Sequence, residues 1–483
     1  MTLRLLFKLG TAASLLLAAV SAFARVTLPE QLGDYCILQQ QTSANLWGRA
    51  AANSKVTVKP SWSKTSYSVT ADAQGRWLIA VDTPKASYDP QTITISDKDG
   101  SVTLHDVLIG EVWLAGGQSN MEMPLIGFNS CPVEGAAETI LRAGEWKGKV
   151  RSVKIPKTGN PEPQEFVEGK WVETSPVTAK DISATAWYFA TALNAALDVP
   201  VGIVSCNWGG SSVESWLPKE VVHSYPPSTI PDGSCEPVIT EGGWYHYTSP
   251  YVMYNAMIHP VSHYTVKGFI WYQGETNAGL PQYYPERLAT MVKIWRELWG
   301  DPELPFYEVE LAPWLYGGDG TSGARIREAQ RKAAQIIPHS GIICTNDLAY
   351  PFEKDQIHPC QKRQVGERLA LLALNRSYGM EALACEGPVY KDIEISGNTV
   401  TVNFTNTAYD GLSPWHDIVG FELAGEDRVF YPARAERKDY SVVVTCEQVP
   451  SPVAVRYCFR DFQVGNLTGS MNLPAFPFRS DDW

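Results

Sequence analysis

One serine in this sequence stands where a chain commonly presents a nucleophile. An apolar run, residues 112–115, ends on Gly116 and Gly117, and Ser119 follows two residues later. Glycines at the end of a strand let the backbone turn sharply, so that the next side chain stands clear of the sheet edge. A lone serine in such a turn is more often structural. Ser119 is therefore a candidate nucleophile only if a base is found elsewhere.

The base is predicted near residue 358. Asp355 lies three residues before His358, after a strand-like run over residues 341–345. A carboxylate on the same loop can hold an imidazole in one tautomer, so that its other nitrogen accepts a proton from a serine hydroxyl. Pro359 is expected in the first turn of a following helix that carries Val365 and Leu369 on one face.

Two further loops follow short apolar runs and carry donors for a developing oxyanion. Residues 201–205 lead into Gly209 and Gly210, and residues 268–272 lead into Gln273 and Asn277. A glycine amide and a side-chain amide are the donors that stabilise a tetrahedral intermediate in ester hydrolysis. The four loops together predict an acyl-transfer site.

These motifs resemble one known family. Sequences G-Q-S-N-M at 117–121, N-W-G-G at 207–210, W-Y-Q-G-E-T-N at 271–277 and D-Q-I-H-P at 355–359 are similar to those of the sialate O-acetylesterase family of SGNH (GDSL-like) hydrolases. The resemblance extends over nearly the whole chain after residue 24, including Y-N-A-M-I-H-P at 254–260 and P-A-F-P-F-R at 474–479.

The resemblance implies roles for individual residues. Ser119 would be the nucleophile and His358 the general base, without a metal or an organic cofactor. The orienting acid would be Asp355, because the position two residues before the histidine, where many relatives carry it, is Gln356. Glu275 and Asp347 are alternatives, and a Ser–His pair with weak support from an acid is a third arrangement. The oxyanion hole would be lined by the following residues: Ser119, Gly209, Gly210, Gln273 and Asn277.

The expected substrate is an O-acetylated carbohydrate, with sialic acid first. Substrate contacts are predicted for four residues in or near the motif loops: Gln118, Trp208, Tyr272 and His246. The aromatic residues among them belong to a large set of 16 Trp and 22 Tyr, some of which we expect to stack on sugar rings. Acetylated xylan or pectin is an alternative substrate, and a non-catalytic glycan-binding protein is an alternative function.

Composition excludes several other classes. The net charge of −12 and the isoelectric point near 5.3 argue against nucleic acid or an anionic membrane as a partner. Phosphate-binding glycine motifs are absent from the sequence, so no nucleotide site is predicted.

The N-terminus predicts export. Residues 1–24 combine Arg4 and Lys8, a short apolar run and Ala22-Phe23-Ala24, which is the pattern of a cleaved signal peptide. We therefore expect a periplasmic or secreted protein without membrane insertion after cleavage. Nine cysteines permit disulfides in that setting; Cys446 with Cys458 is the favoured pair, and Cys131 with Cys235 a weaker one.

The patterns along the chain predict three parts. Short β-like runs suggest an N-terminal β domain over residues 25–108, and alternating strands and helices suggest an SGNH-type three-layer α/β/α catalytic domain over 109–380 with a mostly parallel sheet. Alternation returns in a C-terminal β-sandwich domain over 381–483. Because ligands of such sheets bind beyond the carboxyl ends of the strands, the four motif loops are expected to converge there.

Overall fold

A mostly parallel sheet forms the centre of the computed structural model, which describes residues 26–407 and 411–483. The expected signal peptide lies outside the described residues. The sheet has the order β13-β12-β11-β7-β10-β8-β9, and every neighbouring pair is parallel except β8 and β9. The strands have these bounds: β7 Ser101–Gly117, β8 Val150–Lys154, β9 Trp171–Glu173, β10 Val201–Asn207, β11 Gly268–Tyr272, β12 Phe306–Val309 and β13 Ser340–Ile343. The predicted α/β class is confirmed.

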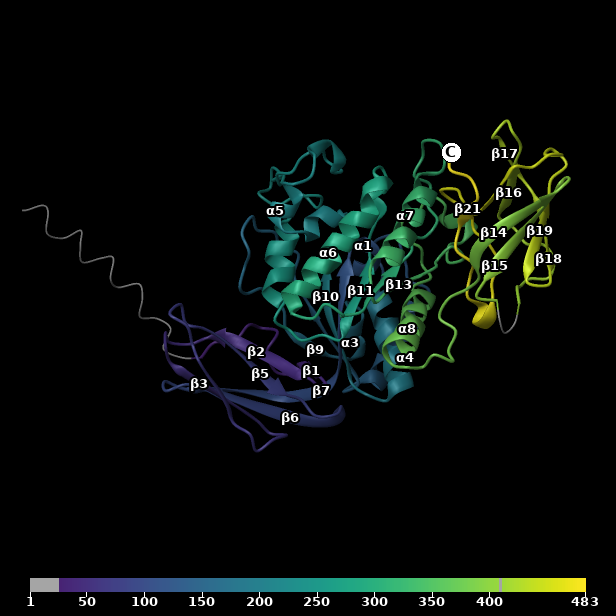
Figure 1. The fold of residues 1–483 in the computed structure, drawn as a ribbon. Helices are drawn as coiled ribbons and strands as arrows, with labels where there is room; N and C mark the ends of the chain where they lie inside the picture. Colours follow the sequence, from purple (N-terminus) through teal and green to yellow (C-terminus); the bar gives the residue numbers. More distant parts are fainter. Residues whose placement is uncertain (1–25, 408–410) are drawn as a thin grey trace, which may run out of the picture.

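Two helix pairs cover the two faces of this sheet (Figure 1). On one face, α4 (Ala184–Leu197) packs against α8 (Arg363–Ser377), and Trp113 of β7 contacts Phe189 of α4 edge to face. On the other face, α6 (Tyr284–Trp299) packs against α7 (Ser322–Ile336), and Trp271 of β11 contacts Trp295 of α6. Strands buried on both sides explain why β10 and β11 are continuous apolar runs in the sequence.

The N-terminal β elements share a strand with the central sheet. Strand β7 pairs with β6 and β1 along its first half and with β10 and β11 along its second half, so the expected boundary at residue 108 falls inside one continuous strand. One hydrophobic core also runs through both parts. The other strands of this region are β1 Ile37–Gln39, β2 Ser43–Arg49, β3 Lys55–Pro60, β4 Tyr67–Thr70, β5 Arg76–Asp82 and β6 Ser87–Ser96.

The C-terminal part is a sandwich with a core of its own. Two four-stranded antiparallel sheets, β14-β15-β19-β18 and β17-β16-β20-β21, enclose a separate hydrophobic cluster. Their bounds are β14 Val389–Ser396, β15 Thr399–Thr405, β16 Phe421–Ala424, β17 Phe430–Pro432, β18 Arg434–Lys438, β19 Ser441–Thr445, β20 Ala454–Tyr457 and β21 Phe478–Arg479. The sandwich predicted from alternating residues is therefore present.

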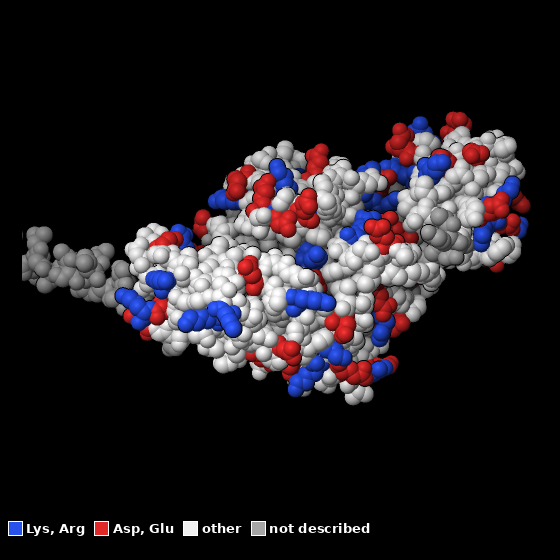
Figure 2. Space-filling model, turned by 60° about the horizontal axis from the view of Figure 1, so that its bottom comes forward, with Lys and Arg blue, Asp and Glu red and all other residues white. Residues whose placement is uncertain are grey.

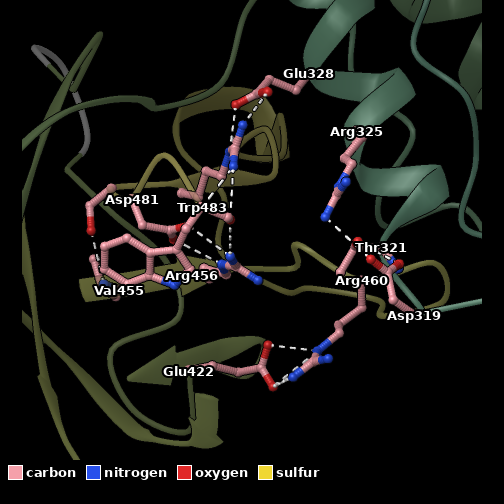
Figure 3. A network of polar contacts seen from close by, with 12 residues as sticks. Asp319, Thr321, Arg325, Glu328, Glu422, Val455, Arg456, Arg460, Asp481 and Trp483 are labelled. Atoms are coloured by element: carbon pink, nitrogen blue, oxygen red, sulfur yellow. Dashed lines mark hydrogen bonds and ion pairs between the residues drawn. The ribbon is translucent and has the colours of Figure 1, made fainter. Parts of the chain in front are cut away.

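Polar contacts join this sandwich to α7 (Figure 3). Glu328 of α7 accepts two hydrogen bonds of 3.0 Å from Arg479 of β21, and the Asp461 carboxylate accepts the Gly323 N–H at 2.7 Å. Within the sandwich, Arg460 binds Glu422. Acidic and basic side chains are also interspersed over the face shown in Figure 2, rather than gathered by sign.

Two local predictions are wrong. All nine cysteines are free thiols: Cys446 follows β19 and Cys458 follows β20, so the two lie in different sheets of the sandwich, and Cys131 and Cys235 are unpaired as well. Pro359 does not begin a helix, because α8 starts at Arg363. Between Pro359 and α8, Cys360 and Lys362 instead bind Glu353 and Asn120. The remaining α-helices are short: α1 Ser119–Glu122, α2 Ala136–Leu141, α3 Pro176–Ala179 and α5 Lys219–Val222.

Candidate active site

The predicted turn before Ser119 is present. Strand β7 ends at Gly117, whose φ of +139° is unfavourable for other residues. A Cβ at Gly117 would also lie 2.2 Å from the Tyr272 carbonyl oxygen, so only glycine fits between β7 and β11. The chain then turns directly into α1, and Ser119 is half-buried at its first position.

The segment that carries His358 is tied to α1 by a side chain next to Ser119. The Asn120 amide donates to the Ile357 carbonyl at 3.0 Å, across 237 residues of sequence. Glu353 fixes the same loop from within, because its carboxylate accepts the N–H groups of Tyr350 and Cys360, each at 2.8 Å. The two distant motifs therefore meet at the carboxyl edge of the sheet.

The imidazole of His358 is half-buried, with one nitrogen beside a thiol. Its Nδ1 lies 3.9 Å from Cys131 Sγ, and its ring meets Phe128 edge to face. Its buried Nε2 has no hydrogen-bond partner among the described residues. Burial, reinforced by the positive charge of Lys362 and opposed by Glu122, lowers the pKa of His358 to about 4. The imidazole is therefore neutral at physiological pH.

None of the three carboxylates considered from the sequence forms a hydrogen bond with His358 in the described part of the chain. Asp355 is exposed and has no hydrogen bond or ion pair there. Asp347 forms a two-pronged ion pair with Arg368, at 2.7 and 2.6 Å. Glu275 accepts a hydrogen bond from the Asn120 amide at 2.6 Å, so it acts on the histidine segment only through Asn120.

A buried lysine that is not among the residues predicted from the sequence completes this cluster. Lys362, at the N-terminus of α8, donates to Asn120 Oδ1 at 2.6 Å, and its Nζ lies 5.6 Å from the centre of the Tyr272 ring. Burial lowers the pKa of Lys362 to about 8 and raises the pKa of Glu275. No sequence motif indicates Lys362 or Cys131, because only the folding of the chain brings these residues to the site.

The loop after β10 brings a backbone donor next to Ser119. The N–H of Gly209 donates to Glu122 Oε2 at 2.7 Å, and a Cβ built at Gly209 would lie 3.2 Å from Ser119 Cβ. Gly210 has φ +81° and lies under the ring of Tyr247, where a Cβ would approach within 2.6 Å. The Gly209 amide can therefore hold a negatively charged oxygen beside the candidate nucleophile.

The two predicted side-chain donors are directed elsewhere. Gln273 is fully buried, and its amide donates to the Ser211 carbonyl and to Asn277 Oδ1, both at 2.9 Å. The Asn277 amide donates to Glu214 at 3.0 Å. With their N–H groups bound in this way, these amides support the loop after β11 rather than face Ser119.

The predicted substrate contacts differ in exposure. Trp208 is half-buried beside Gly209. Gln118 and Tyr272 are buried; Gln118 accepts the Gly274 N–H at 3.1 Å, and the pKa of Tyr272 is raised well above its usual value by burial. His246 is half-buried and contacts Thr248 through Nδ1 at 2.6 Å. Of these four, Trp208 belongs to the loop that contacts Ser119, and Gln118 directly precedes Ser119.

Comparisons with known proteins agree on one family. The family model described as "Carbohydrate esterase, sialic acid-specific acetylesterase" matches residues 109–375. Sialate O-acetylesterase of Rattus norvegicus is 27% identical over 431 residues, covering 77% of this chain and 78% of that protein. The human enzyme of the same name is 28% identical over 407 residues, covering 77% of this chain and 75% of that protein.

A solved structure is similar over almost the entire chain. The crystal structure of a carbohydrate acetylesterase from Xanthomonas citri superposes with a TM-score of 0.84 and 34% identity, and the match covers 95% of this chain and 100% of that one.

Proposed function

Because the chain belongs to the carbohydrate esterase family of sialic acid-specific acetylesterases, we propose that it removes O-acetyl groups from sialic acids by a serine esterase mechanism that uses Ser119 and His358. The family resemblance found in the sequence is thereby confirmed, and the protein is a carboxylic ester hydrolase. The roles of the individual residues are our proposal.

The observation that carries this proposal is the Asn120 bridge. One side chain, adjacent to the candidate nucleophile, binds the carbonyl adjacent to the candidate base. The same side chain accepts a hydrogen bond from Lys362 and donates one to Glu275, so its orientation is fixed on both sides. The bridge joins the two segments that carry the nucleophile and the base, although the Ser119 hydroxyl forms no hydrogen bond with His358 among the described residues. Catalytic hydrogen bonds of this kind often shorten only when substrate binds.

In the first step, the Ser119 hydroxyl attacks the acetyl carbonyl carbon and its proton passes to His358. Nε2 is the accepting nitrogen, because it has no protein partner in the described chain, whereas Nδ1 faces Cys131. The tetrahedral intermediate collapses, the C–O bond to the sugar breaks, and the proton on Nε2 goes to the leaving sugar alcohol. Water then attacks the acetyl-serine with His358 again as base, which releases acetate.

We propose that the backbone N–H groups of Ser119 and Gly209 donate hydrogen bonds to the oxyanion of the tetrahedral intermediate. Gly209 already donates to an anionic oxygen, that of Glu122, at 2.7 Å. The carboxylate of Glu122 therefore has to leave Gly209 before the oxyanion forms. Lys157, which binds the other carboxylate oxygen at 2.8 Å and is largely exposed, gives Glu122 a partner that can move with it.

We propose a Ser–His pair rather than a full triad, since Asp355 is exposed and makes no hydrogen bond to His358. Cys131 Sγ occupies the side of the imidazole where a triad carboxylate would bind. A thiol is a weak partner for an imidazolium. His358 would then depend on burial and on the Asn120 bridge for its position.

The test is acetate release from O-acetylated sialic acid by the wild-type protein and by Ser119→Ala. We expect the substitution to lower kcat by at least about 1,000-fold, the scale observed when a serine hydrolase loses its nucleophile. Ser130→Ala is the control, because Ser130 is an exposed serine on the neighbouring turn. Equal turnover by Ser119→Ala and the wild type would refute the assignment.

Acetylated xylan and acetylated pectin, assayed in parallel, test which carbohydrate is the preferred substrate. Fold and nucleophile do not fix the sugar. Faster acetate release from either polysaccharide than from sialic acid would replace the substrate part of the proposal and leave the chemistry intact.

We further propose that residues 1–24 are a cleaved signal peptide and that the mature protein is exported. The charged start, the short apolar run and the small residues before Arg25 support this proposal. Among residues 26–407 and 411–483, no helix is long and apolar enough to cross a bilayer. N-terminal sequencing of the protein recovered from the periplasm or medium should begin at Arg25.

A further inference from the structure

A cavity of about 320 Å³ lies beside the end of α1, the short helix that begins at Ser119. It lies at the carboxyl ends of β8 and β10, on the same edge of the sheet as Ser119. Glu122 forms one wall, and the same carboxylate contacts Gly209 next to Ser119. Its polar and charged lining includes Glu122, Lys154, Lys170, Lys180, Ser205 and Asn207. This size falls within the range of small-ligand sites.

The charge of this lining is not balanced. Lys180 pairs with Asp181 at 2.6 Å, and Lys170 lies 3.5 Å from Glu30. Glu122 is paired with Lys157. Lys154, at the end of β8, has no ion pair or hydrogen bond to any other described side chain. In a chain with a net charge of −12, a free ammonium group beside the catalytic edge favours an anionic ligand.

A buried polar atom in the same cavity also lacks a partner. Asn207 is 5% exposed, and its Nδ2 donates to Ser205 Oγ at 2.8 Å. Its Oδ1 has no hydrogen-bond partner among the described residues. Buried amide oxygens are nearly always satisfied, so this position can accept a hydrogen bond from a ligand hydroxyl. The free ammonium and the free acceptor are independent observations that point to one ligand.

We propose that this cavity binds the carboxylate-bearing end of an acidic sugar, with the Lys154 ammonium on the carboxylate and Asn207 accepting a hydrogen bond from a hydroxyl. The inference rests on the proposed esterase function and adds the residues that recognise the acidic group of its substrate. Lys154 and Asn207 are specificity residues and take no part in the chemistry. They make the enzyme prefer acetylated acidic sugars to acetylated neutral ones.

The experiment compares two substrates that differ at one group: O-acetylated sialic acid, which carries a carboxylate, and its uncharged carboxyl methyl ester. The readout is the ratio of kcat/KM for the acid to kcat/KM for the methyl ester, measured within each variant so that general damage cancels. In Lys154→Met we expect this ratio to fall about 10-fold, as for the loss of one charge-assisted contact. Lys147→Met is the control: this exposed lysine pairs with Glu173 outside the cavity and should keep the wild-type ratio.

Ionic strength gives a second readout. The KM of the wild type for the acid should rise with salt, and Lys154→Met should lose most of this dependence, because an exposed charge pair is screened. A ratio that is equal in Lys154→Met and the wild type, or a wild type that treats acid and methyl ester alike, would overturn the inference.

A binding measurement separates this inference from the proposed function. Free sialic acid, the expected product, is titrated calorimetrically into Ser119→Ala and into Ser119→Ala with Lys154→Met. Weaker binding by the double variant supports the subsite even if the wild type releases no acetate. Binding of equal strength, or no binding by either variant, refutes the subsite, whereas a wild type without esterase activity refutes the proposed function alone.

Discussion

The low pKa of His358 gives a pH profile that distinguishes this site from an ordinary triad. Burial lowers the pKa to about 4, with a further lowering by Lys362 and an opposing effect of Glu122. A depressed histidine pKa means that the neutral, basic form persists as the pH falls, and that activity is lost only when the pH passes through the lowered value. We therefore expect the acidic limb of kcat/KM near pH 4.

The size of the effect follows from the fraction of neutral imidazole. At pH 5.5 this fraction is about 97% for a pKa of 4 but about 9% for an unperturbed pKa of 6.5. The wild type should therefore keep nearly all of its pH 8 value of kcat/KM at pH 5.5. A histidine supported by a carboxylate would lose most of it, because a negative neighbour raises the pKa.

The assay is kcat/KM for a chromogenic acetate ester between pH 4 and 9, where kcat/KM reports groups of the free enzyme. Lys362→Gln should move the acidic limb upward, because it removes the positive charge that disfavours imidazolium and keeps a donor for Asn120. Lys354→Gln, an exposed lysine on the same loop, is the matched control and should leave the limb in place. A wild-type limb between pH 6 and 7 would refute the reasoning and would indicate a carboxylate on His358.

Three further results are expected. Asp355→Asn should lower kcat less than 10-fold, far less than His358→Ala; a loss of about 10⁴-fold, as when a triad acid is replaced, would restore Asp355 as the orienting acid. Burial raises the pKa of Glu310 to about 7, so the native state holds a proton that the unfolded state releases near its usual pKa. The contribution of Glu310 to the free energy of unfolding therefore falls by about 3 kcal/mol as pH rises from about 4.5 to about 7. Glu310→Gln removes this loss, and its advantage in Tm over the wild type should grow between pH 5 and pH 8; a constant difference would contradict it. Gly366→Ala should destabilise the protein by about 1–3 kcal/mol, since a Cβ there would lie 2.6 Å from the α4 backbone, whereas Gly144→Ala, with nothing within 4 Å, should be neutral in thermal denaturation.

Much of the architecture was predictable because local patterns suffice for it. Buried strands β10 and β11 are apolar runs of strand length, and the helix after β11 carries apolar residues at helical spacing. Parallel strands direct their carboxyl ends to one edge, which brings the motif loops together without further information. The requirement for glycine at 117 is likewise local to the turn, although its cause is the Tyr272 carbonyl of the next strand.

The sequence by itself therefore determined the fold class, the family and the segments that form the site. The tertiary structure decided how their polar side chains are paired. It sets Cys131 rather than Asp355 beside His358, directs the Gln273 amide to Ser211, and joins Asn120 to Lys362, which is 242 residues away. The physical reason is that a buried polar group must find a partner, and that partner is whichever group the packing brings within about 3 Å, independent of spacing along the chain.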